Sequence, residues 1–306
     1  LCSQHIGSRR EGLFLRTCNK LLVMKNFIFL ALAAISLSSC ADVSGALFAG
    51  GDGTYDFKNE YLDSGFQVDE SKIHLLDLES GIEDTIYALF VGDFAQIATD
   101  TIVVFLHGNT PSMDSYWQTA GLFANLVNRH HYGFIMYDYR GFGWSTGRST
   151  GEESMAADYD AVLSFLQAQG LTSDRMIVVA NSLGSLPAGP AAAGGSRIPV
   201  QKLVMEVPQS TANVIMQNAT GLSLPASMIT SYKFDLGQNM EDYTGELLWM
   251  HGTEDAVAPI ETAEAAMQKY QGAYYQEAVY EGAGHGLRWD IGDDEWSKVV
   301  LDFIRH

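Results

Sequence analysis

The sequence predicts an α/β protein with a mostly parallel central sheet and helices on both faces. Short apolar runs alternate along the chain with longer segments of helical apolar spacing, which is typical of strand–helix–strand units. Several runs, such as Thr101–Leu106, are continuously apolar and bounded by turn residues. Strands of a parallel sheet, which are buried on both faces, have this pattern.

We expect two short strands first and a regular alternation of strands and helices after them. The expected strands cover about 73–78, 84–91, 101–106, 133–137, 176–180, 202–205, 246–250 and 274–280. The expected helices cover about 114–129, 152–169, 183–194, 260–270 and 293–305. About 40 residues between Glu206 and Glu246 contain no clear strand. A connection of this length usually carries local helices or a functional loop.

The N-terminal segment resembles an export signal. Met24 is followed by a lysine and an apolar run from Phe27 to Leu37, and Leu-Ser-Ser-Cys, ending at Cys40, resembles the bacterial lipobox. The run is shorter than the roughly 20 residues that cross a bilayer. We therefore expect residues 1–39 to be an upstream leader and lipoprotein signal peptide that is removed. The alternative is a buried N-terminal helix that ends at a free cysteine.

In this interpretation Cys40 carries a lipid that attaches the protein to a membrane of the bacterial cell envelope, on its periplasmic or cell-surface face. Residues 40–58 are rich in Gly, Ala and Asp and would form a tether. The remaining 59–306 would form a single folded domain. It contains no cysteine, so it has no disulfide framework and no cysteine metal site.

The chain is strongly acidic. It has 18 basic and 37 acidic residues, and 13 against 36 remain after residue 39. This charge argues against nucleic acid as a partner. The sequence has no phosphate loop, zinc spacing or dinucleotide fingerprint, so we expect no cofactor and no metal. We expect a monomer that acts on a small molecule.

Four short segments place a serine, an acid and a histidine in one chain order. Ser182 directly follows an apolar strand and precedes Gly184, as in a tight strand-to-helix turn that exposes the serine hydroxyl. Asp255 follows another strand, and His285 lies in a glycine-rich loop with little core to fill. The segments are Phe-Leu-His-Gly-Asn (105–109), Ala-Asn-Ser-Leu-Gly (180–184), His-Gly-Thr-Glu-Asp (251–255) and Gly-Ala-Gly-His-Gly (282–286).

This order of Ser182, Asp255 and His285 resembles the catalytic triad of the α/β-hydrolase family. The resemblance covers roughly 60–306 and is closest to the branch of monoacylglycerol lipases and serine aminopeptidases. It implies an α/β-hydrolase fold with a short cap insertion at about 207–245. It also implies a serine hydrolase that works through an acyl-enzyme intermediate.

The resemblance further implies two backbone donors for the oxyanion, the N–H groups of Leu183 and Asn109. The loop that begins with Asp138-Tyr-Arg-Gly resembles one that is structural in the family. The apolar residues of 207–245 predict a cover over Ser182 that favours esters of short or medium acyl chains.

Some features depart from the family pattern. Ala180 replaces the usual first glycine of the serine motif, and Pro187 and Pro190 lie in the expected helix after it. An interior proline costs a helix about 3 kcal/mol. Glu206, at the end of an earlier strand, is the alternative acid. The alternative functions are a serine peptidase, a thioesterase or a non-catalytic surface binding protein of the same fold.

Overall fold

The structure is a computed structural model that describes residues 48, 50–63, 65–81, 84–127, 132–220 and 233–306. The expected leader, Cys40, part of the expected tether and 221–232 of the expected cap lie outside the described residues. Among the residues that are described, no helix has the length and apolar character needed to cross a membrane.

Eight strands form one sheet in the order β1-β2-β4-β3-β5-β6-β7-β8. The second strand, β2, is antiparallel to both of its neighbours, and all other neighbouring strands are parallel. The strands are β1 (Ile73–Ser80), β2 (Asp84–Val91), β3 (Thr101–Leu106), β4 (Tyr132–Tyr137), β5 (Met176–Asn181), β6 (Lys202–Glu206), β7 (Glu246–Gly252) and β8 (Tyr274–Tyr280).

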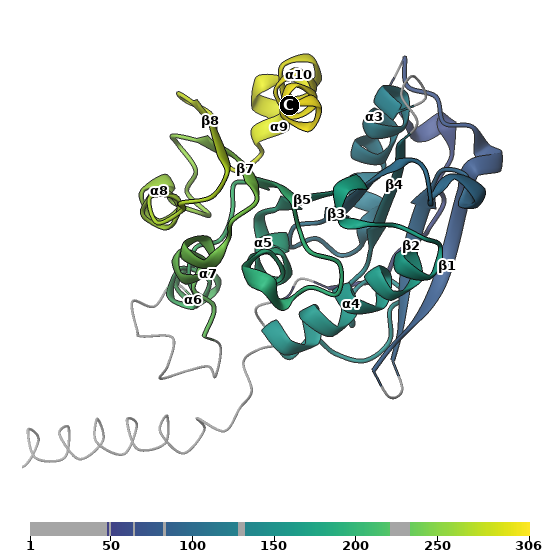
Figure 1. The fold of residues 1–306 in the computed structure, drawn as a ribbon, viewed down its shortest axis with the longest axis horizontal. Helices are drawn as coiled ribbons and strands as arrows, with labels where there is room; N and C mark the ends of the chain where they lie inside the picture. Colours follow the sequence, from purple (N-terminus) through teal and green to yellow (C-terminus); the bar gives the residue numbers. More distant parts are fainter. Residues whose placement is uncertain (1–47, 49, 64, 82–83, 128–131, 221–232) are drawn as a thin grey trace, which may run out of the picture. The chain divides into compact units, whose positions relative to one another are not determined.

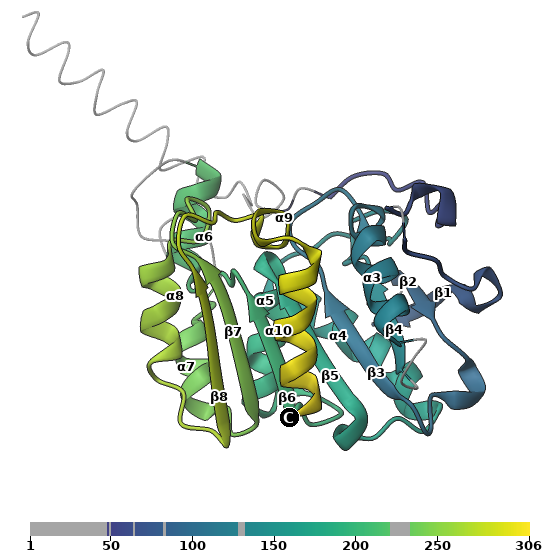
Figure 2. The same cartoon turned by 90° about the horizontal axis from the view of Figure 1, so that it is seen from above.

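Helices cover both faces of this sheet. Figures 1 and 2 show α3, α9 and α10 on one side, and α4, α5 and α7 on the other. The α-helices are α3 (Trp117–Val127), α4 (Glu152–Ala168), α5 (Ser185–Pro190), α6 (Ala212–Thr220), α7 (Leu236–Asp242), α8 (Ile260–Met267), α9 (Leu287–Ile291) and α10 (Asp293–Arg305). Short 3-10 helices span Asn59–Tyr61, Glu70–Lys72, Phe94–Gln96, Met113–Tyr116, Ser173–Arg175 and Ser182–Gly184.

The core beneath α3 and α10 is aromatic. Phe123 of α3 packs against Phe134 of β4 and edge-on against Trp296 of α10, with ring centroids 5.3 and 5.6 Å apart. Alternate residues of a strand point to opposite faces. Val103 and Phe105 therefore join this cluster. The intervening residues of β3 support the helices on the other face.

This architecture confirms the predicted fold class. Each expected strand is present, and the segment between β6 and β7 contains α6 and α7. The helix expected at 183–194 differs from the prediction, because α5 passes after Pro190 into a π-helical turn, Ala191–Gly195, in which Gly194 has non-helical backbone angles. Proline lacks the N–H that would continue the α-helical pattern, which explains this local change in winding.

Candidate active site

Ser182 lies on a sharp turn between β5 and α5. Its φ angle is +49°, a left-handed conformation that non-glycine residues adopt rarely and at a cost of about 1–3 kcal/mol. A Cβ atom at Gly184 would lie 2.1 Å from the carbonyl oxygen of Leu106, so this position requires glycine. The methyl group of Ala180 is fully buried and leaves the turn intact. The turn therefore has the form of a nucleophile elbow despite Pro187 and Pro190.

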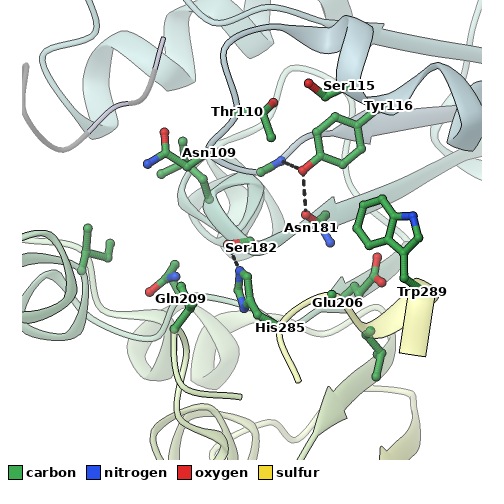
Figure 3. Close-up of a pocket in the computed structure, with 16 residues that line it drawn as sticks. Asn109, Thr110, Ser115, Tyr116, Asn181, Ser182, Glu206, Gln209, His285 and Trp289 are labelled. Carbon is green, nitrogen blue, oxygen red and sulfur yellow. Dashed lines mark hydrogen bonds between the residues drawn. The ribbon is translucent and has the colours of Figure 1, made fainter. Parts of the chain in front are cut away.

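The three predicted side chains lie in one hydrogen-bonded row. His285 Nε2 is 2.8 Å from Ser182 Oγ (Figure 3), and His285 Nδ1 is 2.8 Å from Asp255 Oδ2. Ser182 follows β5, Asp255 follows β7 and His285 follows β8, so all three lie at the carboxyl ends of parallel strands. Ligand sites of open α/β sheets are found at this edge.

The environment of Asp255 keeps it ionised. Burial acts to raise the pKa of Asp255, but hydrogen bonds from His251, His285 and the backbone of Ala258 outweigh it and hold the pKa well below its usual range. The other carboxylate oxygen, Oδ1, accepts from the backbone N–H groups of Val257 and Ala258, both at 2.8 Å. An ionised Asp255 requires His285 to donate through Nδ1, which leaves Nε2 free to accept the serine proton.

His251 is a further partner of Asp255 that the sequence analysis did not assign. The indole N–H of Trp249 donates to His251 Nδ1 at 3.2 Å, so the histidine proton is on Nε2. That Nε2 lies 2.8 Å from the carbonyl oxygen of Ala258 and 3.4 Å from Asp255 Oδ2. The only signal in the sequence was the four-residue spacing between His251 and Asp255.

Glu206, the alternative acid, has different partners. Its Oε1 accepts from the indole N–H of Trp296 at 3.0 Å, and Asn181 lies beside it. Burial raises the pKa of Glu206, although Asn181 and Trp296 both act to lower it. Asp255, and not Glu206, contacts the imidazole of His285.

The loop after β3 is fixed by several hydrogen bonds. The Tyr139 hydroxyl donates to the carbonyl oxygen of His107, and His107 Nδ1 donates to that of Gly108, both at 2.8 Å. The backbone N–H of Met113 donates to Asp138 Oδ1 at 2.7 Å. Asp138 is fully buried in this network. These contacts hold the residues on both sides of Asn109.

A pocket of about 500 Å³ opens over Ser182. Both expected oxyanion donors, Asn109 and Leu183, line it, as do Glu206 and His285. Its apolar lining comes from Leu183, Ile215, Val257, Leu287 and Trp289. Among the described residues that line this pocket, none is a lysine or an arginine. Among all the residues that the structure describes, no group of three or more His, Cys, Asp or Glu side chains could hold a metal ion.

A protein-family model described as "alpha/beta hydrolase fold" matches residues 101–228. The alpha/beta hydrolase domain-containing protein 17B of Homo sapiens is 27% identical over 187 residues, which are 60% of this chain and 59% of that protein. Protein 17C of Mus musculus is 26% identical over the same length and 53% of its own chain. The chain thus spans less than two thirds of the curated relatives it matches.

Solved structures with the same architecture are more distant in sequence. An esterase from Exiguobacterium antarcticum is 19% identical with a TM-score of 0.58, over 76% of this chain and 100% of its own. An esterase from Pyrococcus furiosus is 16% identical with a TM-score of 0.62, over 78% and 91%. A bromoperoxidase from Bacillus anthracis is 18% identical with a TM-score of 0.58, over 76% and 100%. The protein therefore has the α/β-hydrolase fold.

Proposed function

We propose that this protein is a serine hydrolase that cleaves carboxylic esters through an acyl-enzyme intermediate on Ser182. The observation that carries the proposal is the continuous row of Asp255, His285 and Ser182, with both hydrogen bonds at 2.8 Å. This row ends in a pocket, at a serine held in a left-handed conformation. Esterases among the solved structures of this fold support the same reaction class.

The geometry is suited to acyl transfer. His285 Nε2 takes the proton of Ser182 Oγ while that oxygen attacks the ester carbonyl, and the same nitrogen then protonates the leaving alkoxide. A water molecule activated by His285 releases the acid. The N–H groups of Leu183 and Asn109 would stabilise the oxyanion, where one donor is worth about 10²–10³ in rate. Asp255 holds the imidazole in the required tautomer.

The pocket favours neutral esters with short or medium acyl chains. Its volume of about 500 Å³ is that of a small-molecule site, and Ile215, Val257 and Trp289 give it apolar walls. The one acid of its lining, Glu206, would oppose an anionic substrate, and no described lining residue is a cation that could compensate. A p-nitrophenyl ester series should therefore give its highest kcat/KM at short or medium length. A maximum at long chains would contradict this substrate class.

We also propose that the protein works at a membrane of the bacterial cell envelope, attached through a lipid on Cys40. The support is the sequence Leu-Ser-Ser-Cys after a short apolar run. More than one acyl chain gives stable attachment, whereas a single chain is marginal.

Labelling with a fluorophosphonate probe tests the proposed function directly. The parent protein should be labelled and should hydrolyse p-nitrophenyl esters, and Ser182→Ala should do neither. A folded parent that resists the probe and leaves the esters intact would contradict the proposal and favour a binding protein of this fold. Faster cleavage of aminoacyl amides or thioesters than of esters would favour the alternative peptidase or thioesterase.

A further inference from the structure

A chain of hydrogen bonds between residues that line the pocket connects the loop after β3 to Asn181 at the end of β5. The backbone N–H of Gly108 donates to the Tyr116 hydroxyl at 3.0 Å, and this hydroxyl donates to Asn181 Oδ1 at 3.1 Å (Figure 3). The Asn181 side chain lies beside Glu206 and acts to lower the pKa of that carboxyl. At the far end, Trp296 of α10 donates to Glu206 Oε1 at 3.0 Å.

The direction of each hydrogen bond follows from its ends. A backbone N–H can only donate, so the Tyr116 oxygen accepts from Gly108 and its own proton is available for Asn181 Oδ1. The amide of Asn181 then presents its NH₂ group to Glu206. The indole N–H of Trp296 also can only donate. Glu206 therefore accepts from Trp296 and has the NH₂ group of Asn181 beside it.

Loss of a hydrogen bond at Tyr116 or Glu206 should cost free energy, because both side chains are largely buried. Glu206 and Tyr116 are only 4% and 8% exposed, so a lost partner is not readily replaced by water. Burial also raises the pKa of Tyr116 well above its ordinary value, so its hydroxyl keeps the proton that Asn181 accepts. The Tyr116 hydroxyl therefore remains a donor to Asn181 over the pH range in which an esterase would work.

The same atoms are packed tightly against Gly108. A Cβ atom at this position would lie 2.6 Å from the Tyr116 hydroxyl and 2.7 Å from Asn181 Oδ1. Gly108 directly precedes Asn109, and Asn181 lies two residues before Leu183. The chain therefore joins the two backbone segments that carry the expected oxyanion donors.

We propose that Tyr116 and Asn181, supported by the neighbouring Glu206, are positioning residues that hold the N–H groups of Asn109 and Leu183 at the spacing the oxyanion needs. None of them bonds to the reacting atoms in this arrangement. They act by fixing the end of β3 against the end of β5. This inference rests on the proposed hydrolase function, since an oxyanion forms only if Ser182 attacks an ester.

The test compares Tyr116→Phe with Tyr137→Phe. Tyr137 is a matched control, because it is fully buried and its hydroxyl has no hydrogen-bond partner in the part of the chain that the structure describes. Tyr116→Phe should lower kcat by about 10- to 100-fold, less than loss of a direct oxyanion donor, with KM little changed. Tyr137→Phe should keep the parent's kinetics.

Affinity for a trifluoromethyl ketone separates positioning from a general structural effect. This inhibitor forms a hemiketal with the serine and places an oxyanion where the transition state has one. Its affinity should fall by the same factor as kcat/KM in Tyr116→Phe. Glu206→Gln removes one of two acceptor oxygens and should show a smaller parallel loss. If Tyr116→Phe does not fold, the Glu206→Gln variant tests the positioning role in its place.

Different results would refute the hydrolase function and the positioning role of Tyr116. A parent protein that neither reacts with a fluorophosphonate nor hydrolyses esters would refute the hydrolase function itself. An active parent whose Tyr116→Phe variant loses no more activity than Tyr137→Phe would refute the positioning role alone. A loss of kcat with unchanged trifluoromethyl ketone affinity would refute it as well.

Discussion

Replacing Asp255 with asparagine should abolish most of the activity while leaving the fold intact. Two backbone N–H groups, those of Val257 and Ala258, donate to Oδ1 at 2.8 Å, so an asparagine oxygen would remain at that position. The NH₂ group would then replace Oδ2 and face His285 Nδ1. If the asparagine amide were turned the other way, its NH₂ group would face two backbone N–H donors. Each of these donors would lose its acceptor, at a cost of about 1–3 kcal/mol.

An NH₂ group at this position can only donate, so His285 Nδ1 would become the acceptor and its proton would move to Nε2. Nε2 could then no longer accept the proton of Ser182. Loss of the useful tautomer costs about 10⁴-fold in kcat, or about 5 kcal/mol of transition-state stabilisation. The assay is hydrolysis of a short p-nitrophenyl ester, with the thermal midpoint measured on the same samples.

Glu206→Gln is the control for this prediction. Glu206 accepts from Trp296, lies beside Asn181 and has no hydrogen bond to the imidazole of His285, so its loss should cost far less than that of Asp255. The reasoning would be refuted if Asp255→Asn kept most of the parent's turnover. If both variants were well folded and Glu206→Gln were less active than Asp255→Asn, Glu206 would replace Asp255 as the catalytic acid.

Three further predictions follow from the structure and the sequence. Because the folded pKa of Asp255 is depressed, its contribution to stability is present above the unfolded carboxyl pKa of about 3.9 and is lost as pH falls through the folded value. The difference in unfolding free energy between the parent and Asp255→Asn, from urea titrations, should therefore shrink between about pH 5 and pH 3; a constant difference would argue against the depressed pKa. Gly184→Ala should lower both the thermal midpoint and kcat, since its Cβ would lie 2.1 Å from a carbonyl oxygen of β3, and a variant with the parent's values would contradict this close approach. Cys40→Ala should release the protein from the membrane fraction or leave it uncleaved, and retention with normal processing would exclude the lipid anchor.

The sequence predicted the sheet well, because strands β3 to β7 are short and largely apolar runs that need no distant information, although β1 and β8 also contain polar residues. It also placed Ser182, Asp255 and His285 after three different strands, now β5, β7 and β8, whose parallel order brings their ends to one edge. The helix after Ser182 was predicted less well, since helical spacing continues through Pro190 although the backbone changes its winding there. At five residues, α9 is too short to have a periodic signal.

The sequence could not predict contacts between side chains that are far apart in the chain. Tyr116 and Asn181 are 65 residues apart, and Glu206 and Trp296 are 90 apart. No local pattern marks either pair, because each side chain alone suits an ordinary core or loop position. The preference of His285 for Asp255 over Glu206 likewise depends on where two loops meet.

The position of Trp289 gives the site a spectroscopic property of its own. Its indole lines the pocket and is 71% exposed, whereas Trp117, Trp249 and Trp296 are almost completely buried. Trp144 is the one other tryptophan with substantial exposure, at 47%, and it does not line the pocket. Quenching by a water-soluble quencher such as iodide therefore acts mainly on these two indoles. A Trp144→Phe background leaves Trp289 as the accessible emitter, so ligands entering over Ser182 can be followed by their protection of its fluorescence, even when they carry no chromophore and are never cleaved.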